Sequence, residues 1–252
     1  HIPPPTAPLL GVGFPAIPTL PVGLTRLRQP PPPEGASVAI GEAWRISPVG
    51  VAGMLAVGGL SMMIAGFAPI HATASGYSQK DVATLMFAMP LGTLFFQIPS
   101  GWTSARTARP YALIPAAILA VIAGAAASRF DGGPLLLMIA IYLVWSGASE
   151  SIYSLSSAHA NDRASKEELV RLSGTMLFLW SVSGFLVPGI GTALTAVYGT
   201  ASFILVAIVI AALFCAFTIW RVMRSPRVPA EAAGPFTPLS AQAPLPVPSA
   251  EE

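Results

Sequence analysis

Residues 201–224 read ASFILVAIVIAALFCAFTIWRVMR, in which twenty residues without a charged side chain are followed by two arginines within four positions. A helix needs roughly 20 apolar residues to cross a hydrocarbon layer about 30 Å thick. The stretch therefore has the length and composition of a membrane-spanning helix. Arg221 and Arg224 mark its end at a membrane surface.

Five further stretches of the same character precede it, so the sequence predicts an all-α membrane protein with a bundle of six transmembrane helices. Hydrophobic residues make up 54% of the chain and charged residues 10%, whereas a soluble domain carries about 25% charged residues. The six stretches cover about Pro48–His71, Val82–Trp102, Tyr111–Ser128, Pro134–Ser157, Val170–Val197 and Ala201–Arg221.

The basic residues between the spans fall almost entirely on one side. If each span crosses once, one face holds 11 of the 13 Lys and Arg residues, and the other holds only Lys80 and Arg129. Loops rich in Lys and Arg stay in the cytoplasm. We therefore expect both chain termini on the cytoplasmic side of the membrane.

The segments outside the spans are rich in proline or in polar residues. Residues 1–33 contain 11 prolines, which exclude a regular spanning helix. The chain begins with His1 and not with methionine. We therefore interpret the chain as a piece of a longer gene product. We divide the chain into an irregular Pro-rich lead-in (1–24), a cytoplasmic linker with a short surface helix (25–46), the six-helix bundle (47–223) and a disordered Pro/Ala-rich cytoplasmic tail (224–252).

The fourth span carries the one acidic residue that lies well inside a predicted helix, Glu150. Ionisable groups within spans are costly and mark functional sites. Polar residues recur around it at steps of three or four, which places them on one helical face that must meet other helices or water. They are Tyr142, Ser146, Ser149, Glu150, Tyr153 and Ser157.

A second polar stripe lies along the second span. Two interpretations of the two stripes remain open. They could line a hydrated pathway, or they could form interhelical hydrogen bonds of about 1 kcal/mol or less each. Glu150 could bind a cationic substrate, carry a proton, or only bond to a neighbour. The second stripe comprises Thr93, Gln97, Ser100 and Ser104, and our pathway candidates are Tyr142, Ser146, Glu150, Tyr153, Gln97 and Trp180.

Sequence motifs of enzymes and metal sites are missing. The chain has no GxSxG, P-loop, HExxH or paired-cysteine motif, and Cys215 is its single cysteine. His71 is isolated in sequence. We therefore predict no catalytic residue, no metal and no cofactor. The net charge of +2, with only two lysines, does not indicate nucleic acid as a partner.

The segment after the second span reads GWTSARTAR over residues 101–109. It resembles the cytoplasmic Gly-x-x-x-Asp-Arg-x-x-Arg loop of the major facilitator superfamily, with Gly101, Arg106 and Arg109 matching. In that family the loop helps to close a cytoplasmic gate. The acidic position holds Ala105 here, so the ion pair that this Asp makes in the family is not expected.

The run YSLSSAHANDR, residues 153–163, is similar to the end of the tenth helix in a branch of bacterial YcaD-like transporters of that superfamily, through His159, Asn161 and Asp162. The resemblance implies that the six spans are helices seven to twelve of a twelve-helix carrier. It also implies alternating access in a bacterial inner membrane and a missing N-terminal six-helix half. The partners would be the lipid bilayer and a small-molecule substrate, whose transport could be coupled to protons.

Two other classes of function remain open for a chain with six spans. A membrane scaffold or receptor subunit without cargo would have its polar stripes used up in helix contacts. A six-helix membrane enzyme would need catalytic acids, histidines or metal ligands gathered near one interface, whereas His159, Asp162 and Glu150 all lie on one short segment.

Overall fold

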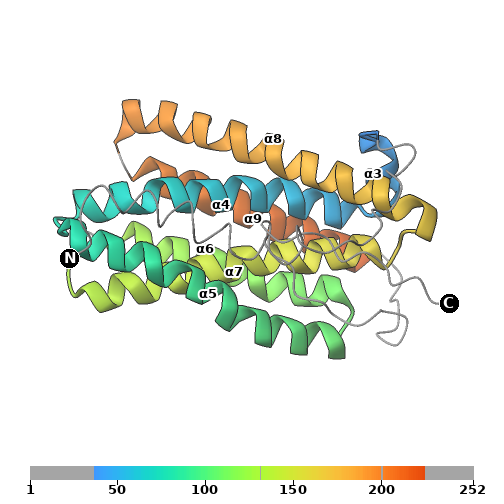
Figure 1. Cartoon of the computed structure of the whole chain (residues 1–252), viewed down its shortest axis with the longest axis horizontal. Coiled ribbons are helices and arrows are strands. Elements are labelled where there is room, and N and C mark those ends of the chain that lie inside the picture. Colours follow the sequence, from blue (N-terminus) through green and yellow to red (C-terminus); the bar gives the residue numbers. More distant parts are fainter. Residues whose placement is uncertain (1–36, 131, 200, 225–252) are drawn as a thin grey trace, which may run out of the picture. The chain divides into compact units, whose positions relative to one another are not determined.

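A computed structural model describes residues 37–130, 132–199 and 201–224, and all regular structure in these ranges is helical. The predicted lead-in, most of the predicted linker and the predicted tail from residue 225 lie outside the described residues. The helices, shown in Figure 1, are α3 (Ile40–Ile46), α4 (Pro48–Ala74), α5 (Gln79–Arg106), α6 (Arg109–Ser128), α7 (Leu135–Asn161), α8 (Lys166–Tyr198) and α9 (Ser202–Arg224).

Six of these helices, α4 to α9, are long and apolar enough to cross a membrane. The candidate spans run from 20 residues in α6 to 32 residues in α8, with mean hydropathy between 1.5 and 2.8. The prediction of an all-α, multi-pass membrane protein is therefore confirmed. Most helices are longer than the apolar stretches, because polar caps and surface turns extend them at their ends.

Helix starts follow from local capping. At α5 the Asp81 N–H donates to Ser78 Oγ at 3.3 Å, and the Ser78 N–H donates to Asp81 Oδ2 at 3.1 Å. At α8 the Ser165 N–H donates to Glu168 Oε2 at 2.9 Å. Such reciprocal pairs satisfy amide groups that the first helical turn leaves unpaired. The two capping boxes thus fix where these spans begin.

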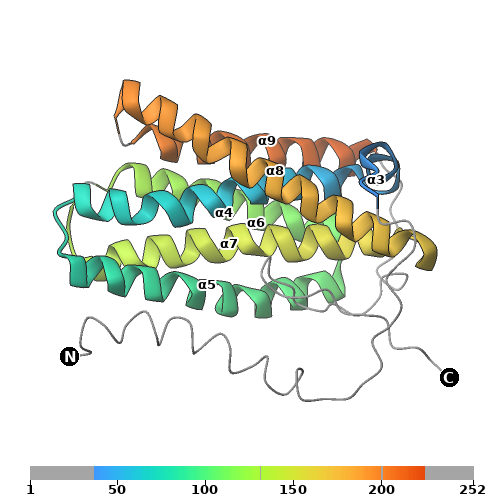
Figure 2. The ribbon, with the colours of Figure 1, turned by 45° about the horizontal axis from the view of Figure 1, so that its top comes forward.

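Helices α4 and α7 form the centre of the bundle. Helix α7 packs against α4, α5 and α6, and α4 packs also against α8 and α9. In Figures 1 and 2, α8 and α5 lie on opposite sides of α4 and α7. Within the span windows, 67% of α4 is buried but only 17% of α5 and of α8. The two flanking helices therefore present long unpacked faces.

Two glycines allow the central and flanking helices to approach closely. A Cβ on Gly58 of α4 would collide with the backbone carbonyl of Trp180 on α8. A Cβ on Gly92 of α5 would collide with the carbonyl of Leu143 on α7. In lipid, small residues at crossings replace the hydrophobic drive that packs helices in water. Both flanking helices are thus held by backbone-to-backbone contact.

The short helix α3 confirms the surface helix predicted in the last part of the linker. The Ala39 N–H donates to Thr175 Oγ1 at 3.0 Å, and Glu42 forms an ion pair with Arg171 at 3.2 Å. The rings of Trp44 and Phe217 lie 6.0 Å apart between centroids. These contacts fasten α3 to α8 and α9.

Candidate functional site

A cavity of about 430 Å³ lies between α4, α5, α7 and α8. This volume falls in the range of small-molecule sites, roughly 300–1,000 Å³. Leu94, one of its lining residues, is 61% exposed, so the cavity opens onto the surface of the bundle. Its polar lining consists of Ser61, Thr93, Gln97, Ser146, Ser149 and Glu150, together with the indole of Trp180.

Glu150 is the acidic group of this cavity. Its Oε1 accepts a hydrogen bond of 2.5 Å from Ser61 Oγ on α4. Among the described residues this is the one hydrogen bond to its carboxyl group, and none of the residues lining the cavity is basic. A carboxyl group inside a span is therefore held by a single neutral hydroxyl, an arrangement that is costly unless a ligand or a proton compensates it.

Two further polar atoms of the cavity wall lack partners among the described residues. These are Ser149 Oγ and Trp180 Nε1, both buried. Most buried polar atoms in proteins are hydrogen-bonded. The hydroxyl of Ser149 and the indole N–H of Trp180 are thus polar groups of lining residues whose hydrogen-bonding capacity is unused among the described residues.

Four of the six pathway candidates come together at this cavity, namely Gln97, Ser146, Glu150 and Trp180. The other two do not line it. Tyr142 is fully buried, and its hydroxyl lies 2.7 Å from His71 Nδ1. Tyr153 is 4% exposed within the hydrophobic core. Both tyrosines belong to the polar stripe predicted for this helix, but in the structure both lie in the hydrophobic core instead of the cavity wall.

Some residues of the polar stripe of α5 line the cavity, and others form hydrogen bonds between helices. Thr93 and Gln97 line the cavity. Ser100 Oγ instead donates to Ser151 Oγ of α7 at 2.9 Å, and Ser104 Oγ accepts from Arg109 at 3.1 Å. The stripe is therefore part cavity wall and part helix contact.

Sequence reasoning missed the contribution of α4. Ser61 is an isolated hydroxyl in a glycine-rich apolar span, where no periodic signal marks it. Three methionines of the apolar wall, Met62, Met86 and Met89, were missed for the same reason. Methionine is common in cores, so only the three-dimensional arrangement shows that these side chains meet.

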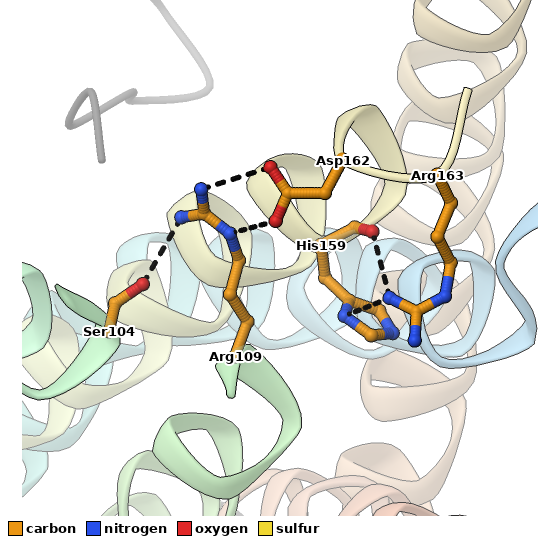
Figure 3. A network of polar contacts seen from close by, with 5 residues as sticks. All are labelled: Ser104, Arg109, His159, Asp162 and Arg163. Atoms are coloured by element: carbon orange, nitrogen blue, oxygen red, sulfur yellow. Dashed lines mark hydrogen bonds and ion pairs between the residues drawn. The ribbon is translucent and has the colours of Figure 1, made fainter. Parts of the chain in front are cut away.

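A second polar site joins the two motifs at the arginine-rich end of the bundle (Figure 3). Arg109 Nε and NH2 bond the two carboxylate oxygens of Asp162, the latter at 3.0 Å, and NH1 donates to Ser104 Oγ. The Arg109 side chain is 3% exposed and that of Asp162 is 17% exposed. This two-point ion pair connects the start of α6 to the end of α7.

His159 and Arg163 extend this site. Arg163 NH1 donates to His159 Nδ1 at 2.7 Å, so that nitrogen accepts and His159 carries its hydrogen on Nε2. Partial burial lowers the pKa of the Arg163 guanidinium below its ordinary value, the charge of Asp162 opposes this shift, and the charge of Arg221 adds to it. Asn161 is the last residue of α7 and is half-buried.

The segment expected as a loop after the second span is largely helical, which corrects that expectation. Gly101 and Arg106 lie in the last turns of α5, and Arg106 stacks over the ring of Trp102 at 3.9 Å from its centroid. The helix ends where Thr107 becomes extended, just before Pro110 occupies the first turn of α6. A proline fits there because the first turn leaves its amide unpaired in any case.

His71 is not isolated in the folded chain. Its Nε2 lies 3.0 Å from the Phe130 carbonyl and its Nδ1 lies 2.7 Å from Tyr142 Oη. Since a carbonyl can only accept, Nε2 is the donor and Nδ1 accepts from the tyrosine. These two hydrogen bonds of His71 connect α4 to α7 and to the segment after α6. They lie at the end of the bundle opposite Arg109.

Within the described ranges no three His, Cys, Asp or Glu side chains gather closely enough to hold a metal ion.

Comparison with known proteins gives one match. A family profile described as Major Facilitator Superfamily matches residues 49–247. No curated protein and no solved structure matches the chain.

Proposed function

The chain belongs to the major facilitator superfamily, a family of membrane transporters, and from that premise we propose that it forms the C-terminal half of a secondary active transporter of small molecules. The cavity between α4, α5, α7 and α8 carries this proposal, because it combines a charged group, unpaired hydrogen-bonding atoms and an apolar wall. In the proposed arrangement the six spans are helices seven to twelve of a twelve-helix carrier.

The unpacked faces of α5 and α8 support a partner half of six helices. Both helices contribute to the cavity, and both expose large apolar side chains nearby, such as Phe95 and Phe185. Two bundles rocking about a site between them would expose it alternately to the two sides of the membrane. The N-terminal bundle would then supply the second wall of the site.

The distribution of charge supports the proposed orientation. Arg106, Arg109 and Arg163 lie at one end of the bundle, whereas Lys80 and Arg129 lie at the other. With the arginine-rich end inside, both termini are cytoplasmic. We place the protein in a bacterial inner membrane, because of the similarity of its residues 153–163 to YcaD-like transporters.

The ion pair of Arg109 with Asp162 supports a gating role for the motif that contains Gly101, Arg106 and Arg109. This ion pair connects the junction of α5 and α6 to the end of α7, on the proposed cytoplasmic side. Because Ala105 stands at the acidic position of the family motif, this pair would be the main charged contact that the motif contributes in this half.

A scaffold without cargo has less support. It would need its polar stripes occupied by helix contacts, as Ser100 and Ser104 are. The hydroxyl of Ser149 instead has no partner among the described residues, and Ser146, Ser149 and Gln97 line the cavity.

Alternating access can be tested by the accessibility of Ser146. The intact protein, made without other cysteines, would carry Ser146→Cys and be labelled with a membrane-impermeant maleimide from either side of oriented vesicles. We expect labelling from both sides. The buried native Cys215, kept as the single cysteine in a control, should stay unlabelled. Labelling of Ser146→Cys from one side only, under all conditions, would contradict alternating access.

A further inference from the structure

We propose that the cavity binds an amphipathic organic monocation, in which one ammonium group is attached to an apolar or aromatic body. This inference rests on the proposed transport function and specifies the substrate class of the same cavity.

The charge of the ligand follows from Glu150. Its carboxyl group lies in the cavity wall with Ser61 as its hydrogen-bond partner, and no lining residue carries positive charge. Inside a low-dielectric bundle, a carboxylate attracts a cation and repels an anion far more strongly than in water. One carboxylate matches one positive charge, so a monocation fits and an organic anion does not.

Hydrogen-bond acceptors surround the carboxylate on two helices. Ser146 and Ser149 belong to the same helix α7, and Gln97 faces the cavity from α5. Ser149 is 1% exposed, and its hydroxyl has no partner among the described residues. An ammonium group with N–H bonds offers up to three donors. Glu150, Ser149 and Gln97 together can accept them.

The rest of the cavity wall is apolar and adaptable. Met62 comes from α4, Met86 and Met89 come from α5, and the indole of Trp180 comes from α8. Methionine side chains are flexible and polarisable and fit varied apolar shapes. A tryptophan ring adds attraction for a nearby cation through its π-face. The acceptors and the apolar wall thus select a ligand with a charged end and an apolar body.

A sugar fits this distribution poorly. Its hydroxyl groups point in all directions, and burying those that face the methionines would leave them unpaired. Each unpaired buried hydroxyl costs about 1–3 kcal/mol in proteins.

A charge series on one aromatic body tests the inference on the unaltered intact protein. The probes are 1-naphthylmethylammonium, the neutral 1-naphthalenemethanol and the anionic 1-naphthoate, and their binding to the detergent-purified protein is measured by isothermal titration calorimetry. We expect the ammonium to bind roughly 10- to 100-fold more tightly than the alcohol, as a charge-assisted hydrogen bond implies. Naphthoate should bind more weakly than both.

Two variants test whether the tighter binding of the ammonium arises in the cavity. Glu150→Gln keeps the shape of the side chain, so it should remove the advantage of the ammonium over the alcohol. Retained alcohol binding also shows that the cavity is intact. Glu167→Gln, an exposed acid at the start of α8 and outside the cavity, is the matched control and should leave the series unchanged.

The cation assignment is overturned if the alcohol or naphthoate binds as tightly as the ammonium, if the ammonium does not bind, or if Glu150→Gln keeps the difference. Each of these results concerns the substrate class only. Labelling of Ser146→Cys from the two sides decides the transport proposal separately, so the two failures are distinguishable.

Discussion

Placing the carboxyl group of Glu150 inside a span costs more free energy than its hydrogen bond with Ser61 returns. Interhelical hydrogen bonds in membranes are worth about 1 kcal/mol, whereas an acidic residue at the centre of a span costs about 2.5–3.5 kcal/mol on insertion scales. The hydroxyl of Ser61 alone does not offset that cost. The pair therefore makes more sense as part of a binding site than as structural support.

At this residue we expect Glu150→Gln to remove most transport without lowering the stability of the folded protein, since the substitution removes a costly buried acid. The amide keeps the size of the carboxyl group and can still bond Ser61, but it can neither balance a cation nor carry a proton. Uptake into vesicles across a range of pH, together with thermal melting in detergent, checks both parts. Unchanged uptake with an unchanged pH dependence would rule out both active roles of Glu150.

The ion pair between Arg109 and Asp162 should contribute measurably to the stability of the folded protein. Removing one partner of a buried pair leaves the other charge uncompensated and typically costs about 3 kcal/mol or more. Asp162→Ala should therefore lower stability by about 3 kcal/mol, measured by thermal unfolding in detergent. This effect comes from the guanidinium of Arg109, whose side chain is 3% exposed.

The chain provides a matched control for that measurement. Glu42 pairs with Arg171, whose side chain is 40% exposed, and surface pairs contribute about 0–1 kcal/mol. Glu42→Ala should thus change stability by less than about 1 kcal/mol. If the two variants were equally stable, the Arg109–Asp162 pair would not have the structural weight we assign to it.

Among the helices, the crossing of α4 and α8 depends on Gly58. A methyl group at this position meets the backbone carbonyl of Trp180, which cannot move without displacing α8. Gly58→Ala should destabilise the protein by about 1–3 kcal/mol, as overpacking does in other cores. Thermal melting and the yield of monodisperse protein in detergent measure the effect.

Gly66 of the same helix is the control for this prediction, because a Cβ there has no atom within 4 Å. Gly66→Ala should be neutral or stabilise the helix by up to about 1 kcal/mol, since alanine favours helix more than glycine does. Equal destabilisation by both substitutions would show that close approach at Gly58 is unimportant.

The long apolar stretches of the sequence predicted the spans well, because a bilayer imposes a minimum length and a low polarity on each helix. They predicted the helix ends less well: α5 continues past Trp102 to Arg106, since nothing in that segment opposes helix until Thr107. Three residues of the predicted α7 stripe, Ser146, Ser149 and Glu150, line the cavity. The stripe also included Tyr142, because helical spacing defines a face but not how far along that face a cavity extends.

The contribution of α4 to the cavity could not be predicted from periodicity. Ser61 and Met62 become cavity residues only because α4 packs between α7 and α8. Likewise, the contact between Arg109 and Asp162 joins residues 53 positions apart. Such pairings depend on which helices become neighbours, and one sequence does not encode that in its local pattern.

At the scale of the whole molecule, the six helices form a bundle with a packed centre and two flanking helices that have long exposed faces. The exposed apolar residues of α5 and α8 include Phe87 and Phe185, which are 75% and 79% exposed. Lipid could cover these faces, but the cavity opens between the same helices. A second bundle of the same kind would both cover them and close the site, as the proposed twelve-helix carrier requires.

We expect the 252-residue chain alone to show little or no transport, because in the proposed carrier a partner half would supply the second wall of the site. Purified and reconstituted into vesicles, it should fail to accumulate a substrate that the intact protein takes up under the same conditions. A control vesicle with the intact protein shows that the assay works. Robust uptake by the chain alone would contradict the need for a partner half.

The proposed transport function requires that the helices cross a bilayer with the arginine-rich end inside. Single cysteines at the two ends of α5, introduced as Lys80→Cys and Thr107→Cys, test it directly with a membrane-impermeant maleimide on whole cells. We predict that Lys80→Cys is labelled from outside, and that Thr107→Cys is labelled only after the membrane is permeabilised. Labelling of both positions from the same side would contradict the membrane arrangement and the transport function derived from it.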